Sequence, residues 1–330
     1  MGWLTRAIDA GGDSRATMDD LEDGLFITSG DRRSKLSQFW VLLVLASVIA
    51  AGGVVGDSTP AVIGAMIVAP LATPIYGVAL ASVTGLRREL LASLGLLAAG
   101  VVVNILIGLL LGAVTVARLP VEANPQILGR TAPTLLDLTV AVAVGIAGSF
   151  ALVRRDVSNI LAGVAIAISL VPVLAVVGIT LGSGRLDLAW GAFVLFLTNA
   201  AAIIIAGVLV FTAAGYARVA TARGRQPRRR AKVLIVVFVV VLLVPLAATS
   251  FRTLEYELWV RATDETAHLW VEGTDWEVSG VTQVSDDIVI TVLGQGDKPS
   301  IEALREDVRR DVPSSVRVLV IEETGKTTAL

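Results

Sequence analysis

The sequence contains no cysteine and only one histidine, His268. Without cysteine the protein has no disulfide, no thiolate nucleophile and no thiolate-bound metal. The sequence also has no complete Gly-x4-Gly-Lys-Ser/Thr phosphate loop, no Ser-His pair and no group of residues with metal-ligand spacing. We therefore expect a protein that is not an enzyme and that has neither a cofactor nor a metal site.

Charged residues are scarce through the middle of the chain. Residues 37–250 contain 20 of the 56 Asp, Glu, Lys and Arg residues, and these 20 lie in short clusters. Most of the uncharged runs between the clusters exceed the roughly 18 apolar residues that indicate a membrane span. This pattern excludes a soluble globular protein and predicts the lipid bilayer as the protein's main partner. Nothing in it suggests binding to nucleic acid.

The uncharged runs predict an all-α polytopic membrane protein with seven transmembrane helices. The predicted spans are residues 37–55, 60–86, 90–117, 135–153, 157–181, 188–216 and 233–249. Residues 1–36 form a polar N-terminal segment, in which Met18 to Ile27 form either a short amphipathic helix or a disordered stretch. No apolar segment precedes Asp31, so we expect no cleavable signal peptide.

The distribution of basic residues predicts the orientation in the membrane. The N-terminal flank and the loops after the second, fourth and sixth spans contain 14 Lys and Arg residues, whereas the other loops contain three. Because Lys and Arg concentrate in cytoplasmic loops, we expect a multi-pass protein of the plasma membrane with a cytoplasmic N-terminus. Seven spans then place the C-terminal segment outside the cytoplasm.

Residues 251–330 differ from the rest in composition and predict a small soluble α+β domain. This segment carries a net charge of −8, against +8 for residues 37–250. Apolar–polar alternation predicts strands over Glu255–Val260 and Ile288–Val292. Pro299 is suited to the first turn of a helix ending near Arg310, and Ser315–Ile321 predicts a further strand. The order of elements is then ββαβ or βαββαβ.

The first six spans show signs of an internal repeat. Their lengths run short, long, long and again short, long, long, and the segment Asp57–Gly64 has the same acid-to-glycine spacing as Asp156–Gly163. Because each half has three spans, the second half enters the membrane from the opposite side. The result is a 3+3 inverted repeat, an architecture of many transporters, plus one extra helix. The alternative is chance similarity among segments rich in Ala, Val, Gly and Leu.

One of these segments resembles a known family. Residues 58–75 read STPAVIGAMIVAPLATPI, residues 163–172 read GVAIAISLVP and residues 195–203 read LFLTNAAAI. These segments resemble the prokaryotic integral membrane family known as domain of unknown function 389, and the resemblance covers about residues 37–215. The family's name states no activity, so the resemblance implies a membrane protein of this family and no particular mechanism.

Three prolines interrupt the predicted long spans. Pro70 and Pro74 lie within the second span and Pro172 within the fifth. Proline removes a backbone donor and frees carbonyl groups from the helical ladder, and inside a bilayer those groups need other partners or a cavity. The prolines therefore indicate either a discontinuous helix that presents backbone groups to a substrate, or a kink that serves only packing.

Two amides lie near the middle of long spans, Asn104 in the third and Asn199 in the sixth. A buried amide either hydrogen-bonds between helices as structural glue or binds a substrate. Thr73, Ser169 and Thr198 are further candidates for substrate binding in the same regions. No Asp, Glu, Lys, Arg or His lies in the middle of a span, which argues against a carboxylate-based proton relay.

These features predict a transport protein, either a carrier or a channel, that passes a small solute or ion through a site between the two repeats. The alternative is a non-transporting scaffold or sensor that signals through its external C-terminal domain. Small-residue pairs at Gly52/Gly56 and Gly108/Gly112 are suited to close helix contact. Together with the extra helix and the C-terminal domain, they lead us to expect a homo-oligomer.

Overall fold

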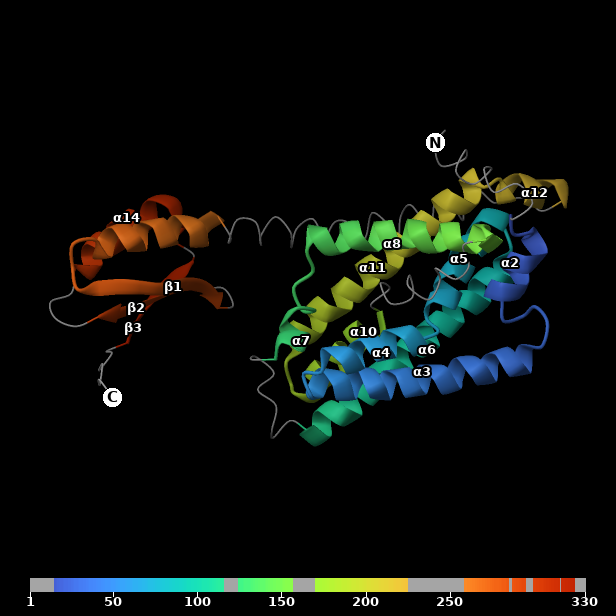
Figure 1. Cartoon of the computed structure of the whole chain (residues 1–330), viewed down its shortest axis with the longest axis horizontal. Helices are drawn as coiled ribbons and strands as arrows, with labels where there is room; N and C mark the ends of the chain where they lie inside the picture. The colour runs from blue at the N-terminus through green and yellow to red at the C-terminus, as the bar shows by residue number, and fades with distance from the viewer. Residues whose placement is uncertain are drawn as a thin grey trace. The chain divides into compact units, whose positions relative to one another are not determined.

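The computed structural model describes residues 15–115, 124–156, 170–224, 258–284, 287–294, 299–314 and 316–323. The chain forms two compact units, Met1–Ala247 and Ala248–Leu330, and each is described by itself (Figure 1). The predicted seventh span, the first part of the predicted fifth span and Ser169 lie outside the described residues.

The first unit is helical. Its helices are α2 (Met18–Leu25), α3 (Arg32–Val55), α4 (Thr59–Val68), α5 (Ala72–Thr84), α6 (Arg87–Thr115), α7 (Pro125–Leu128), α8 (Leu135–Val153), α10 (Leu170–Gly182), α11 (Leu186–Ala213) and α12 (Tyr216–Ala222). Four helices, α3, α6, α8 and α11, are long and apolar enough to cross a membrane, and the bent pair α4–α5 can form a fifth span. The shorter apolar helix α10 lies in the predicted fifth span. These helices are those of a multi-spanning membrane protein.

The predicted second span is broken rather than continuous. Its two helices, α4 and α5, are bent by 44° at residues 69–71. Pro70 lies in this break, and its carbonyl accepts a hydrogen bond from the Thr73 amide at 3.2 Å. Pro74 lies in the first turn of α5, where a missing N–H costs no helical hydrogen bond. The helix is therefore discontinuous at Pro70, as one of the two interpretations predicted, while a role of the freed backbone groups in substrate binding stays a prediction.

Several helices begin at side-chain caps that the sequence supplies locally. Asp31 accepts hydrogen bonds from the Arg33 and Ser34 amides at the start of α3. Thr134 and Asp137 form a capping box at the start of α8, each accepting from the other's backbone amide. The carboxylate in the fourth span therefore serves the N-terminal turn of that helix, a position where the helix dipole favours negative charge.

Helices α6 and α10 pack so closely that only glycine fits between them. A Cβ atom on Gly108 would lie 2.6 Å from the Ala175 carbonyl oxygen, and one on Gly112 would lie 2.7 Å from that of Ile179. Residue numbers rise together along both helices, so α6 and α10 run parallel. The expected role of the Gly108/Gly112 pair is confirmed, and its contact is with α10.

The other predicted glycine pair makes no such contact. Gly52 has no atom within 4 Å of a Cβ position, and Gly56 meets only the Gly52 carbonyl of its own helix. It is Gly53 that faces α4, where a Cβ would lie 3.0 Å from the Val62 side chain. Within the described part of the chain the Gly52/Gly56 pair therefore makes no close helix contact, and its use between subunits stays a prediction.

The N-terminal segment joins the basic loops at one end of the helical unit. Ala16 donates its amide to the Val153 carbonyl at 2.8 Å and accepts from the Tyr216 hydroxyl at 2.7 Å. In α2, Asp20 pairs with Arg155 and Asp19 pairs with Arg223 at 2.8 Å. Of the two alternatives for Met18 to Ile27, the helix is confirmed, since α2 covers most of that range.

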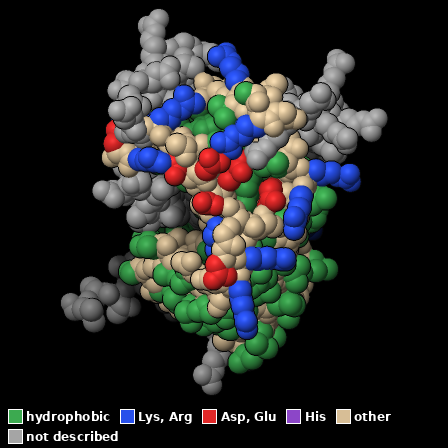
Figure 2. Space-filling model, turned by 90° about the vertical axis from the view of Figure 1, so that its right-hand side faces the viewer, with side chains coloured by type: hydrophobic (Ala, Val, Ile, Leu, Met, Phe, Trp, Pro, Cys, Tyr) green, Lys and Arg blue, Asp and Glu red, His purple; other side chains and the backbone are tan. Residues whose placement is uncertain are grey.

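Acidic and basic side chains gather at this end, above a surface that is otherwise hydrophobic (Figure 2). Lys35 donates from Nζ to the carbonyls of Phe26 and Ser29, and Glu89 accepts from Thr28. The loops predicted to be cytoplasmic therefore meet in space around the acidic helix α2. At the other end, Asn124 donates to the Val54 carbonyl at 2.8 Å and ties the α7 segment to α3.

The second unit is a small mixed sheet with helices. Its strands are β1 (Trp276–Val284), β2 (Asp287–Gly294) and β3 (Arg317–Glu323), in the order β1-β2-β3, with β1–β2 antiparallel and β2–β3 parallel. Helix α14 (Ile301–Asp311) connects the parallel strands, and residues 258–271 are helical. The strands at Ile288–Val292 and Ser315–Ile321 and the helix after Pro299 are confirmed within one residue or two.

The predicted strand at Glu255–Val260 was wrong over residues 258–260, which are helical. Its period-2 alternation spans only six residues, a length that is also compatible with one face of a helix. Farther along, Thr263, Ala267 and Val271 are buried at four-residue spacing, which is the helical pattern. Trp276 belongs to the core of this unit, with Trp259 and Trp270 packed against it.

The close contact between α6 and α10 predicts a strong effect of a single methyl group. We expect Gly108→Ala to reduce the free energy of unfolding by about 1–3 kcal/mol, because the new Cβ meets backbone that cannot move aside. Thermal melting of the full chain in detergent measures this effect. Gly95→Ala on the same helix is the control, since no atom lies within 4 Å of its Cβ position. Equal melting temperatures for the two variants would contradict the contact.

The ion pairs of α2 predict that acid releases the N-terminal segment. The hydroxyl and amide of Thr17, followed by Arg155, hold the pKa of Asp20 below its ordinary value of 3.8. Docking of α2 is therefore favoured above about pH 4 and is lost as the pH falls through the lowered pKa. We expect amide hydrogen exchange in residues 15–27 to increase on acidification, and in Asp20→Asn already at neutral pH. Asp57→Asn, at the other end of the unit, should leave the exchange of residues 15–27 unchanged. If Asp20→Asn also leaves that exchange unchanged, the docking is contradicted.

Candidate functional site

A cavity of about 300 Å³ lies between α8, α10, α11 and the end of the α7 segment. Its lining comprises Gly129, Arg130, Leu136, Asp137, Val140, Ala141, Val144, Leu170, Val173, Leu195, Asn199 and Ile203. The residues from α11 and those from α8 recur about every four positions, which places each set on one face of its helix. The cavity thus reaches from the α7 end of the unit to the middle of α11.

Asn199 is the predicted site residue that lines this cavity. It lies near the middle of α11, between Leu195 and Ile203 on the same face. Its Oδ1 atom is buried and has no hydrogen-bond partner in the described part of the protein. An unpaired acceptor in the wall of a cavity is suited to receive a hydrogen bond from a ligand, because a buried polar group without a partner costs about 1–3 kcal/mol.

Arg130 places a positive charge at the α7 end of the cavity. Its Nη1 atom donates to the Gln126 carbonyl at 2.7 Å and to Gln126 Oε1 at 3.0 Å. Gln126 in turn donates to Thr59 Oγ1 at the start of α4, so the guanidinium is anchored to the first half of the unit. Burial lowers the pKa of Arg130 below its usual value, but an arginine side chain remains charged at any physiological pH.

Asp137 places a negative charge in the same wall. Its Oδ2 atom accepts from the amide and the hydroxyl of Thr134, at 2.8 and 2.7 Å. Within the described residues no ion pair joins Asp137 to Arg130, although both line the cavity. The two charges are therefore each held by their own local bonds and remain separate from one another.

Asn104 lies in a different environment from Asn199. It is fully buried in α6, and neither Nδ2 nor Oδ1 has a hydrogen-bond partner in the described part of the chain. Gly108, one turn later, is in backbone contact with α10, and Gly100, one turn earlier, faces the side chains of Leu71 and Leu43. The amide therefore lies in a closely packed apolar region and is absent from the lining of the cavity described above.

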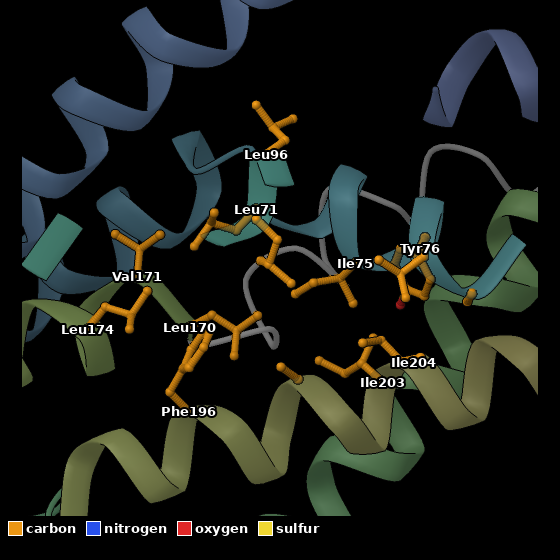
Figure 3. Close-up of a cluster of buried hydrophobic side chains, with 14 of the residues drawn as sticks. Leu71, Ile75, Tyr76, Leu96, Leu170, Val171, Leu174, Phe196, Ile203 and Ile204 are labelled. Atoms are coloured by element: carbon orange, nitrogen blue, oxygen red, sulfur yellow. The ribbon is translucent and has the colours of Figure 1, made fainter. Parts of the chain in front are cut away.

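The three prolines are absent from the cavity lining, and each is next in sequence to a residue of a hydrophobic cluster. Pro74 and Pro172 are buried in α5 and α10, while Pro70 is half-buried in the break. Beside them, Leu71 and Ile75 point toward Leu170 and Val171 of α10, and Ile203 and Ile204 of α11 lie next to Tyr76 (Figure 3). The centre between the two halves is thus filled by aliphatic side chains.

The remaining predicted residues are not brought to the cavity. Thr198 is buried, and its hydroxyl donates to the Val194 and Leu195 carbonyls of its own helix at 3.0 Å. Thr73 is half-buried in the first turn of α5, and Ser169 lies outside the described residues. Of the eight predicted site residues, the structure therefore places Asn199 in the cavity and seven elsewhere or beyond its description.

Sequence reasoning missed Arg130 and Asp137 as site residues. Arg130 counted only as one of three bases in the non-cytoplasmic loops, and Asp137, in the first turn of the predicted fourth span, was not considered for a site. A signal was present, because a charged residue beside an apolar run is unusual where the opposite loops carry so few charges. Their shared cavity with Asn199 depends on contacts between segments far apart in the sequence, which no local pattern contains.

Comparison with known proteins confirms the resemblance noted in the sequence. Residues 66–205 match the family described as Domain of unknown function (DUF389). This range begins just before the break at residues 69–71 and ends within α11, so it contains the break and every cavity-lining residue.

The chain is also 31% identical over 196 residues to an uncharacterized protein of Methanocaldococcus jannaschii. The match covers 59% of this chain and 60% of that relative, so the chain spans about three fifths of the length of the curated relative. No solved structure matches the chain.

The two amides predict changes of different size in the free energy of unfolding when each is replaced by alanine. We expect Asn104→Ala to raise the free energy of unfolding by up to about 2 kcal/mol, because the change removes two buried polar atoms without partners. Asn199→Ala should raise the free energy of unfolding by less, since it removes one such atom rather than two and that atom borders a cavity. Thermal melting in detergent measures both variants, and a clearly lower melting temperature for Asn104→Ala would show that this amide is structural glue.

Proposed function

We propose that this protein is a membrane carrier that moves a small polar solute through a site at Asn199, between two inverted three-helix repeats. The observation that carries the proposal is the contrast between two equivalent amides. Asn199 lines a cavity that reaches the α7 end of the unit, whereas Asn104 is absent from its lining and both polar atoms of its side chain are buried. A carrier needs such a difference between its halves, because only one side of the site is open at a time.

Contacts between the halves support the repeat. Helix α6 packs along α10, and α11 packs along α5. If the third span corresponds to the sixth and the second to the fifth, these two helix pairs correspond to one another. Gly112 lies against α10 and Gly207 lies against Ala79 of α5. Asn104 and Asn199 are separated by the same 95 residues as Gly112 and Gly207.

The direction of the helices supports the same topology. In an alternating series of membrane crossings, the third and fifth spans run the same way, and α6 and α10 are parallel. A spacing of 99 residues relates Asp57 to Asp156, and it also relates Leu71, at the break, to Leu170, the first described residue of α10. We propose on this basis that the fourth span crosses the membrane, with the N-terminus cytoplasmic.

Two features favour a carrier over a continuously open channel. The aliphatic cluster around Leu71, Leu170 and Ile203 fills the space between α5, α10 and α11 (Figure 3), and Leu170 and Ile203 of this cluster also line the cavity. The opposite end is covered by the N-terminal segment, which bonds to Val153, Tyr216 and Arg223. Transport then requires the first half to open at Asn104 while the second half closes at Asn199.

Flux measurements in proteoliposomes test the proposal. A panel of radiolabelled small solutes should contain at least one that enters with saturation and counterflow, which distinguish a carrier from a channel. For that solute we expect Asn199→Ala to weaken apparent affinity by about 5- to 150-fold, from the loss of one buried hydrogen-bond partner. Saturable flux of no solute in the panel would favour the scaffold or sensor alternative.

The absence of cysteine allows a control that needs no substrate. In single-cysteine variants, Val140→Cys in the cavity should react with a membrane-impermeant thiol reagent from outside only, and Asn104→Cys from the cytoplasmic side only. Val142→Cys, exposed on the same helix and not part of the cavity lining, should react from neither side. Reaction of Val140→Cys from both sides indicates a channel, and no reaction of Asn104→Cys from either side contradicts alternating access.

A further inference from the structure

We propose that the cavity recognises a small aliphatic zwitterion, with Arg130 binding its anionic group and Asp137 its ammonium group. This inference rests on the proposed function, because it names the substrate class of that same cavity. It follows from the presence of two opposite charges in one wall that do not pair with each other.

Opposite charges that line one cavity attract one another and can form an ion pair. Here each charge is held apart by its own segment. Arg130 is fixed through Gln126 to Thr59 on α4, and Asp137 is fixed by the capping box of α8. The anchoring bonds keep the two side chains from collapsing onto one another.

Each charged group uses only part of its hydrogen-bonding capacity for this anchoring. Both bonds of the Arg130 guanidinium within the described residues come from Nη1, and a guanidinium has five N–H donors. Both bonds of the Asp137 side chain are accepted by Oδ2. One edge of the guanidinium and one carboxylate oxygen therefore remain for a ligand.

A ligand that satisfies both groups carries a negative and a positive charge on one small molecule. A simple anion would give Asp137 no opposite charge and would repel it, and a simple cation would do the same to Arg130. Asn199 Oδ1 supplies a further acceptor, which suits a second N–H of an ammonium group. The zwitterion as a whole is neutral, which agrees with a cavity whose two charges cancel.

Size and the remaining lining limit the ligand further. A volume of about 300 Å³ lies at the lower end of the range for small-molecule sites, so the ligand has few non-hydrogen atoms. Val140, Val173 and Ile203 supply an aliphatic wall that suits a hydrogen or a short alkyl side chain. An amino acid with an aliphatic side chain has all of these properties.

Equilibrium binding to the purified full chain in detergent tests the inference. The probes are L-alanine, β-alanine and γ-aminobutyrate, which differ in the separation of their charges, with propionate and n-propylamine as singly charged counterparts. We expect at least one zwitterion to bind at least about tenfold more tightly than either counterpart. If no zwitterion binds, or if propionate or propylamine binds as tightly, the inference is overturned.

Variants of the two charges separate recognition from a structural role. We expect Arg130→Gln and Asp137→Asn each to weaken zwitterion binding by about 10- to 150-fold, the effect of losing a hydrogen bond to a charged group. In Asp137→Asn, propionate should no longer bind more weakly than the zwitterion. In Arg130→Gln, the same should hold for propylamine. Arg185→Gln, a charge change outside the cavity lining, is the control. Loss of stability without this change in selectivity would assign both residues to anchoring alone.

The two proposals fail in different ways. If a zwitterion binds with this selectivity but does not cross proteoliposome membranes, the site stands and the carrier function falls. If saturable transport is found only for solutes that are not zwitterions, the carrier stands and the ligand class is wrong.

Discussion

The contact between α6 and α10 constrains the rest of the helical unit. At Gly108 and Gly112 the two backbones approach so closely that no side chain separates them, and small residues are what allows such approach between helices in a membrane. Because the contact continues over several turns, the two helices hold one another at a fixed angle and rotation. That rotation points the Asn104 side chain into the packed interior, where it is fully buried. On α11, Leu195 and Ile203 flank Asn199 one turn away on either side, and these larger side chains border a cavity.

Much of the fold was predictable because lipid makes hydrophobicity a strong signal. Apolar runs longer than a bilayer is thick can hardly be anything other than spans, and α3, α6, α8 and α11 lie where these runs predicted helices. Pro70 predicted the break since proline removes a backbone donor. The soluble unit gave a weaker signal. A six-residue alternation at Glu255–Val260 is compatible with either period, and the burial of Ala267 and Val271 decides for the helix.

The candidate site was less predictable than the fold. Polar residues in the spans could be found from composition, but their surroundings depend on the rotation of each helix, which is set by contacts between distant segments. Thr198 and Asn199 are adjacent in sequence and differ entirely in role, since one bonds its own helix and the other lines the cavity. The α7 segment brings Arg130 to that cavity through bonds to residues about 70 positions away. No local pattern encodes such a bond.

The bonds of Ala16 have a consequence for the synthesis of the protein. Its carbonyl is bonded to Tyr216, 200 residues later in the chain, and its amide to Val153. Ribosomes add about 5–20 residues per second, so Ala16 and helix α2 are made tens of seconds before their last partner exists. During that interval Arg155, the partner of Asp20, is made before Arg223, the partner of Asp19, so the helices are inserted before that end is closed. The N-terminal segment is therefore made early and is among the last parts of this unit to reach its folded position.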